Sequence, residues 1–126
     1  MDTLTEQNRA VVMRFAQLLY TQRDPASAFA QCVAANYIQH NPALADGREA
    51  AVAFLTPLYT AAGATFEVQR ILVDRNLAAL HIRAHPVGRP VLAVADFYRL
   101  DGGLIVEHWD AIQPVPERSA NDHPMF

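Results

Sequence analysis

The chain has 126 residues, enough to bury one core but not two, and we expect a single domain over residues 1–126. Hydrophobic residues make up 52% of the chain and charged residues 18%, which excludes a disordered protein. The net charge of −3 includes ten arginines and no lysine, so the sequence offers no basic stripe for nucleic acid and no polybasic anchor for a membrane.

The cysteine content and the N-terminal segment indicate a cytoplasmic protein. Cys32 is the only cysteine, which excludes an internal disulfide and fits a reducing compartment, and we expect a buried structural thiol. Charged residues at positions 2, 6, 9 and 14 interrupt the apolar residues of the N-terminus, so this segment is neither a signal peptide nor a membrane span. No phosphate-binding loop, Cys-x-x-Cys pair or Gly-x-Ser-x-Gly motif is present, so nucleotide, structural zinc and serine-hydrolase functions lack support.

Two helices are predicted at the start of the chain. Apolar residues recur at three- and four-residue spacing over residues 5–22, and Thr3 with Glu6 forms a capping-box pattern before them. Asp24 followed by Pro25 is typical of an N-cap and a first helical turn, which predicts a short second helix through about residue 33.

A brief strand and a third helix follow. Residues 37–40 are too few for a helix and favour a strand, which Asn41-Pro42 ends. Asp46 with Glu49 repeats the capping pattern and predicts a helix that ends near residue 63. Pro57 lies inside this helix, and we expect it to bend the helix or to separate its last turn.

From residue 65 onward the pattern is that of strands only. Alternating and β-branched residues predict four strands, over residues 65–74, 77–86, 91–100 and 104–114. The short turns between them require antiparallel pairing, because a parallel return needs a long crossover. The sequence therefore predicts an α+β fold in which three N-terminal helices pack on one face of a curved antiparallel sheet.

The last two predicted strands form a hairpin around Asp101-Gly102-Gly103, and its register decides which side chains share a face. A three-residue loop would pair Leu100 with Leu104 and place Asp96 opposite His108. A two-residue Gly-Gly loop would instead place Asp96 beside Glu107 and Trp109. We favour the three-residue loop, because a glycine at its third position commonly closes such hairpins. In that register Asp96, His108 and Asp110 share a face with Tyr98.

Three motifs resemble one protein family over nearly the whole chain. They are YIQHNP at residues 37–42, DG-R-E within residues 46–49, and IVEHWDAIQPVPE at residues 105–117, with the ending SANDHPMF. Together they resemble the SnoaL-like polyketide cyclases, and most closely their predicted aldol-condensation group, within the nuclear transport factor 2-like superfamily. The resemblance implies a cone-shaped α+β barrel that encloses a pocket, often in a homodimer built on the outer face of the sheet.

The resemblance also implies a chemistry, namely intramolecular aldol closure by an aspartate that acts as acid and base, with neither metal nor cofactor. Asp110 resembles that aspartate by its place in the hairpin. Asp96 stands where the cyclases carry a pocket histidine, and in the related ketosteroid isomerases a similarly placed acid helps to hold an oxyanion.

The candidate catalytic residues are Asp110, Asp96 and His40. We expect Asp110 to be the general base, and a neutral Asp96 to steady the enolate oxygen, since two carboxylates in one poorly hydrated site do not both ionise cheaply. His40 precedes a tight turn that can aim its ring into the cavity wall. The alternatives are an Asp96 tied to an arginine, an Asp110 in open water, and a His40 bonded only to backbone.

Further side chains are candidates for binding the substrate: Tyr37, Asn41, Phe54, Tyr59, His81, His108 and Trp109. The alternatives are core or interface aromatics, and for His81 an exposed or dimer-facing polar strip shared with Arg83 and His85. We expect no metal site, because His81 and His85 are four residues apart on a strand, about 13 Å, and do not chelate one ion.

These observations predict a cofactor-free enzyme that abstracts a proton next to a carbonyl of a hydrophobic, polyketide-like molecule. The competing hypothesis is a non-catalytic pocket or dimerisation module. A cavity of several hundred Å³ with convergent acids would favour an enzyme or a ligand binder. We also expect a homodimer, since one outer face would carry a mixture of aromatic and charged side chains: Phe97, Arg99, Glu107 and Trp109.

Overall fold

Helices come first in the computed structural model, which describes residues 2–126. The first helix, α1 (Thr3–Ala16), continues as a π-helical turn, η1 (Gln17–Thr21), and is followed by α2 (Pro25–Cys32) and α3 (Arg48–Thr60). The expected caps are confirmed in one case of three. Asp24 caps α2 by accepting the Ser27 N–H at 3.1 Å, as predicted.

The other two caps were predicted wrongly. Asp2, not Thr3, caps α1 by accepting the Thr5 N–H at 2.7 Å, because the helix already begins at Thr3. Gly47, with φ of 92°, precedes α3, while Asp46 accepts the Gln39 N–H instead. Glycine suits this position because it adopts positive φ without steric cost.

Of the two effects expected of Pro57, a bend or a separate last turn of α3, the separate last turn is wrong. The helix continues through Pro57 to Thr60. Proline has no N–H for the carbonyl of Ala53, but Ala53 lies on the exposed side of the helix, where solvent can satisfy that carbonyl.

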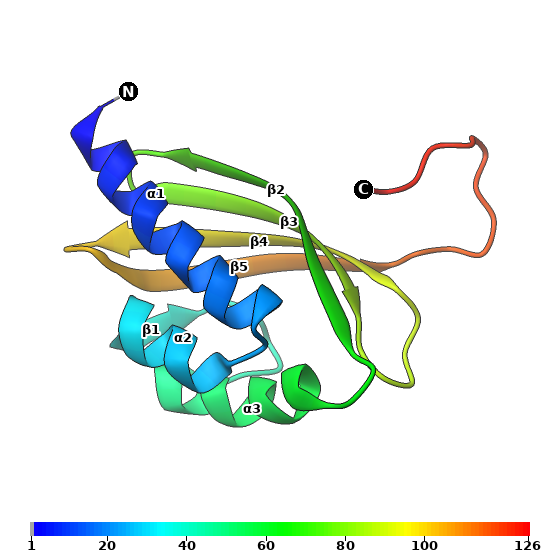
Figure 1. The fold of residues 1–126 in the computed structure, drawn as a ribbon, viewed down its shortest axis with the longest axis horizontal. Helices are drawn as coiled ribbons and strands as arrows, with labels where there is room; N and C mark the ends of the chain where they lie inside the picture. Colours follow the sequence, from blue (N-terminus) through cyan, green and yellow to red (C-terminus); the bar gives the residue numbers. More distant parts are fainter. Residues whose placement is uncertain (1) are drawn as a thin grey trace.

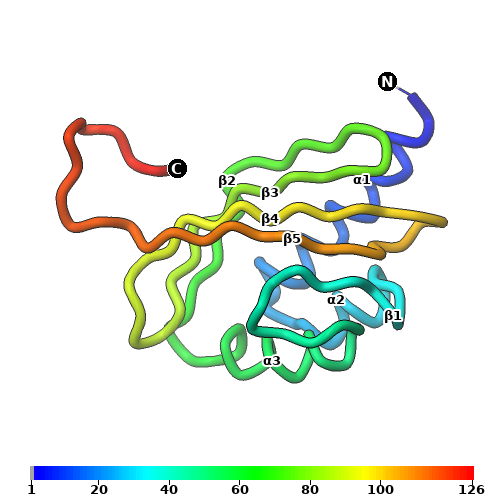
Figure 2. Tube along the Cα trace, turned by 180° about the vertical axis from the view of Figure 1, so that it is seen from behind, coloured from blue at the N-terminus to red at the C-terminus, as the bar shows by residue number. Residues whose placement is uncertain are grey.

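The sheet contains five strands in the order β1-β5-β4-β3-β2 (Figures 1 and 2). They are β1 (Val33–Gln39), β2 (Thr65–Asp74), β3 (Leu77–His85), β4 (Leu92–Asp101) and β5 (Leu104–Pro114). The predicted antiparallel meander from β2 to β5 is confirmed. A purely antiparallel sheet is wrong, since β1 pairs in parallel with β5, and the long intervening chain makes this possible. The sheet is not closed, so β1 and β2 are its edges.

The side chains of the β4–β5 hairpin lie on the expected faces of the sheet, although the register of the hairpin differs from the predicted one. The turn is the two-residue Gly102-Gly103 loop, with Asp101 paired to Leu104, so the pairing of Leu100 with Leu104 is wrong. A bulge then shifts the register between Leu100 and Arg99, and Asp96 pairs directly with Asp110. The bulge restores the parity that a three-residue loop would have given, and the shared face is confirmed.

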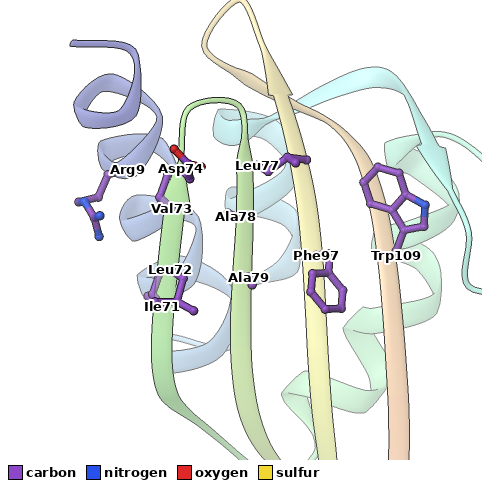
Figure 3. A pocket seen from close by; sticks show the side chains of 10 residues that line it. All are labelled: Arg9, Ile71, Leu72, Val73, Asp74, Leu77, Ala78, Ala79, Phe97 and Trp109. Atoms are coloured by element: carbon purple, nitrogen blue, oxygen red, sulfur yellow. The ribbon is translucent and has the colours of Figure 1, made fainter. Parts of the chain in front are cut away.

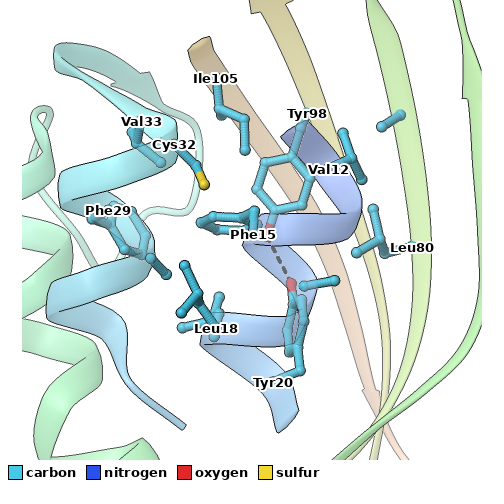
Figure 4. Close-up of a cluster of buried hydrophobic side chains, with 14 of the residues drawn as sticks. Val12, Phe15, Leu18, Tyr20, Phe29, Cys32, Val33, Leu80, Tyr98 and Ile105 are labelled. Atoms are coloured by element: carbon cyan, nitrogen blue, oxygen red, sulfur yellow. Dashed lines mark hydrogen bonds between the residues drawn. The ribbon is translucent and has the colours of Figure 1, made fainter. Parts of the chain in front are cut away.

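Helices α1 and α2 cover one face of the sheet and form the core with it (Figure 4). Phe15 is fully buried and meets the rings of Phe29 and Tyr98 edge-on at centroid distances of 5.5 and 5.2 Å. Cys32 is buried in this core, as expected. No helix of residues 2–126 is both long enough and apolar enough to cross a membrane.

Candidate active site

A cavity of about 320 Å³ lies between the inner face of the sheet, α3 and the segment that follows β1. Its body is apolar, with walls that include Leu55, Phe66 and Ile112. Polar groups converge at one end, where β4 and β5 place Asp96, His108 and Asp110. The cavity meets the size and the acid content that favour an enzyme or ligand binder over a filled module.

Asp96 and His108 form a buried pair across the hairpin. His108 Nε2 lies 2.9 Å from Asp96 Oδ1, and the two residues are only 8% and 6% exposed. The ring of His108 also stacks on Tyr98 at 4.9 Å between centroids. Asp96 is thus held by a histidine, and the alternative of a carboxylate tied to an arginine is not what the structure shows.

Two tyrosine hydroxyls complete the surroundings of Asp96. Tyr20, from η1, donates to Asp96 Oδ2 at 2.6 Å, and its oxygen lies 2.7 Å from the hydroxyl of Tyr98. Burial, reinforced by the negative charge of Asp96, raises the pKa of both tyrosines well above its usual value. Both therefore stay protonated and act as donors, so each oxygen of Asp96 has a protein partner.

Asp110 is held from one side only. Asn41 Nδ2 donates to Asp110 Oδ2 at 2.8 Å, and the Ala43 N–H fixes the amide by donating to Asn41 Oδ1 at 2.9 Å. The same Oδ2 lies 4.0 Å from His108 Nε2. Asp110 Oδ1 has no hydrogen-bond partner among residues 2–126. One carboxylate oxygen is thus anchored and the other is free.

Gln39 joins β1 to this cluster. Its Oε1 lies 2.9 Å from the Asn41 N–H and 2.8 Å from His108 Nδ1, while its Nε2 donates to the Tyr37 hydroxyl at 2.7 Å. Sequence reasoning missed Gln39, Tyr20 and Tyr98 as members of the site. The alternation of β1 could have found Gln39, since it is two residues from Tyr37 and hence on the same face.

The structure brings seven of the ten predicted site residues to the cavity: Tyr37, Asn41, Phe54, Tyr59, Asp96, His108 and Asp110. The placement of His40 in the cavity wall is wrong. Its ring stacks on Trp109 at 5.0 Å, and its Nε2 lies 2.7 Å from Glu107 Oε2. His40 follows Gln39 directly, and successive residues of an extended chain point to opposite faces, so an inward Gln39 turns His40 outward.

Trp109 and His81 are likewise outside the cavity, because their strands point them to the outer face of the sheet. His81 contacts Arg70 and lies 5.8 Å from the Phe126 ring of the C-terminal tail. Trp109 belongs to a row of paired residues across four strands (Figure 3), which we call the outer row: Leu72, Ala79, Phe97 and Trp109. Arg99 and Glu107 share this face, as predicted, and they form an ion pair of 2.7 Å that the predicted register did not foresee.

Among the described residues, Asp96, His108 and Asp110 have donor atoms within 4.8 Å of one another, close enough to consider a metal ion. The geometry does not suit one. In a tetrahedral site with bonds of about 2.1 Å, neighbouring ligand atoms lie roughly 3.4 Å apart, whereas His108 Nε2 and Asp110 Oδ2 are separated by 4.0 Å. His108 Nε2 and Asp96 Oδ1 are already hydrogen-bonded to each other at 2.9 Å, so a metal ion would have to displace this bond.

Comparison with known proteins places the chain in a family. The family model of the SnoaL-like domain matches residues 12–108. No curated protein matches the chain. A solved structure of an NTF2-like protein of unknown function from Mesorhizobium loti has a TM-score of 0.77 at 23% identity, over 90% of this chain and 96% of that one.

Two further structures share the fold at low identity. A candidate ketosteroid isomerase from Kribbella flavida has a TM-score of 0.74 at 22% identity, over 93% of this chain and 85% of that one. A candidate SnoaL-like polyketide cyclase from Jannaschia sp. has a TM-score of 0.69 at 17% identity, over 89% of each chain. The fold match spans nearly the whole chain and the family match more than half of it, so the protein belongs to the SnoaL-like domain family and has the NTF2-like fold.

Proposed function

We propose that the protein removes a proton from the carbon next to a carbonyl of an apolar small molecule, in an aldol cyclisation or an isomerisation. The observation that carries this proposal is the free Oδ1 of Asp110 at the polar end of an otherwise largely apolar cavity of about 320 Å³. A carboxylate with one anchored and one free oxygen suits a general base, because it is oriented and still able to accept a proton.

The enolate formed by this step needs a hydrogen-bond donor, and Asp96 is poorly placed to be that donor. Both of its oxygens are engaged, one by His108 and one by Tyr20. This arrangement argues against our expectation that a neutral Asp96 steadies the enolate oxygen. The role of Asp96 is instead to orient His108 through the hydrogen bond between the two side chains.

Tyr37 and Tyr59 are better placed to bind the enolate oxygen. The Tyr37 oxygen accepts from Gln39, which leaves its own O–H free, and the Tyr59 hydroxyl has no partner among the described residues. Burial raises the pKa of both side chains, so both keep their protons at neutral pH. The proton moves from carbon to Asp110 Oδ1, the charge on the enolate oxygen is met by a tyrosine O–H, and Asp110 later returns the proton; no oxidant is needed.

A ligand screen followed by a turnover assay tests the proposal. Thermal shift against aromatic and polyketide-like carbonyl compounds should identify ligands, and Asp110→Asn should abolish most turnover with a nearly unchanged melting temperature. Ligands that bind equally well to both proteins with no turnover by either would identify a binding module of the same fold instead.

We further propose a homodimer formed through the outer row, in the cytoplasm. Leu72 and Phe97 are 66% and 43% exposed, and aromatic and aliphatic side chains in one contiguous strip suit an interface better than open water. Light scattering at micromolar concentration should give the mass of a dimer, and Phe97→Arg should give a monomer. Leu4→Arg, at an exposed apolar position on α1, is the matched control and should stay dimeric; a wild-type monomer would refute the dimer.

A further inference from the structure

Gln39 contacts three groups of the site whose hydrogen-bond roles are linked. The backbone N–H of Asn41 is a donor only, so the atom of Gln39 that faces it at 2.9 Å is the amide oxygen. The same oxygen faces His108 Nδ1 at 2.8 Å. An amide oxygen is an acceptor only, so His108 Nδ1 must carry a hydrogen.

The other ring nitrogen of His108 then constrains Asp96. Nε2 lies 2.9 Å from Asp96 Oδ1. A neutral histidine with its hydrogen on Nδ1 has a lone pair on Nε2, and an ionised carboxylate at that distance would place two acceptors face to face. One hydrogen must therefore lie between Nε2 and Oδ1, whichever atom holds it.

We propose that Gln39 is a positioning residue that fixes the Nδ1–H form of His108 and thereby keeps a proton in the His108–Asp96 pair. The pair then has no net charge, either as imidazolium with carboxylate or as two neutral groups. The groups around the pair are consistent with the absence of a net charge. Tyr20 on η1 and Tyr98 on β4 supply neutral hydroxyl groups, and Asp110 on β5 is the nearest remaining charge.

This assignment determines which charged groups surround Asp110, the proposed base. Of the cavity-lining residues, only Arg89 at the β3–β4 turn and Asp110 then carry an uncompensated charge. Asp110 is left as the single anionic group at the polar end. The catalytic meaning of Gln39 rests on the proposed function, whereas the form of His108 is a property of the free protein.

Nitrogen NMR of the full-length protein labelled with ¹⁵N-histidine tests the inference without any substrate. His108 signals are assigned by comparison with His108→Asn. In the wild type at neutral pH, His108 Nδ1 should show a directly bonded hydrogen. In Gln39→Met the acceptor is gone, so the hydrogen should move to Nε2, where ionised Asp96 accepts it, and the Nδ1–H signal should be lost.

Two further variants make the result specific. Gln39→Glu offers an acceptor of similar size and should retain the Nδ1–H signal, while Gln113→Met, at an exposed position of β5, should leave the His108 spectrum unchanged. A wild-type His108 with a bare Nδ1, or an Nδ1–H that survives in folded Gln39→Met, would overturn the inference. The wild-type spectrum decides the tautomer even if a variant fails to fold, and neither result depends on whether the protein is an enzyme.

Discussion

The two faces of the β4–β5 hairpin carry opposite kinds of side chain. The inner face buries ionisable groups, Asp96 and His108, while the outer face carries aromatic ones, the exposed Phe97 and the half-buried Trp109. Globular proteins more often show the reverse, so a buried polar group and an exposed apolar strip are the informative exceptions. The difference fits the two proposals made above, an active site on the inner face and a dimer contact on the outer face.

Each face must satisfy a different physical demand. On the inner face each fully buried polar atom needs a partner, because a buried group without one destabilises the fold by about 1–3 kcal/mol. On the outer face a substitution should change the free energy of unfolding little, unless a second copy of the protein covers that side chain. Matched substitutions on the two faces test this contrast.

The largest contrast is expected between adjacent residues of β4. Tyr98→Ala removes a ring that is 96% buried and should reduce the free energy of unfolding by about 3–5 kcal/mol. Phe97→Ala should reduce it by less than about 1 kcal/mol when measured in dilute protein. Urea unfolding followed by circular dichroism measures both values, and equal losses would contradict the assignment of the two faces.

A smaller effect is expected from the tyrosine hydroxyls. Tyr20→Phe leaves Asp96 Oδ2 and the Tyr98 hydroxyl without their shared partner, which should cost about 1–3 kcal/mol of unfolding free energy. Tyr59→Phe, whose hydroxyl has no partner among residues 2–126, should change it by less than about 0.5 kcal/mol. If Tyr20→Phe were as stable as Tyr59→Phe, the hydroxyl network would not contribute to stability.

The smallest effect concerns the polar part of the outer face and depends on pH. Hydrogen bonds from His40 and Arg99 hold the pKa of Glu107 below its usual 4.5. The folded state thus binds this proton less tightly than the unfolded state, so the stabilisation is complete above the unfolded pKa and is lost as pH falls through the folded pKa. The wild type should be slightly more stable than Glu107→Gln near neutral pH.

The difference between these two proteins should disappear as pH falls from about 5 to 3. Urea midpoints of both proteins across this range measure it. A difference that is constant with pH would show that Glu107 contributes through packing and not through its charge.

Much of the fold follows from local sequence pattern. The alternation in residues 65–114 was enough to predict the meander, and Asp24-Pro25 predicted the start of α2. The parallel pairing of β1 was not predictable in this way, because residues 33–36 contain no alternation and their partner strand is about 70 positions away. The bulge opposite Arg99 was not predictable either; the pairing of β5 is irregular between Ile105 and Glu107 with both of its neighbours, β4 and β1.

The site was predictable where strand parity alone decides. Asp96, His108 and Asp110 were assigned to one face correctly even though the loop length was wrong, because the bulge and the longer loop have the same effect on parity. The prediction for His40 was wrong because it ignored strand parity. Its place in a motif suggested a role in the cavity, but the alternation after Gln39 turns its side chain outward. Tyr20 could not be predicted as a site residue, because the periodicity of a helix does not show which strand residue a tyrosine hydroxyl on that helix will contact.

The central claim is that Asp110, on the inner face, removes a proton next to a carbonyl. Deuterium exchange into apolar ketones in D₂O, followed by proton NMR, tests it without knowledge of the natural substrate. For ketones that the thermal-shift screen shows to bind, the wild type should accelerate exchange at the carbon next to the carbonyl. Asp110→Asn should exchange at least about 100-fold more slowly, and Trp109→Phe, on the outer face, should match the wild type. Exchange that is equally fast in Asp110→Asn, or absent in the wild type with every bound ketone, would contradict the claim.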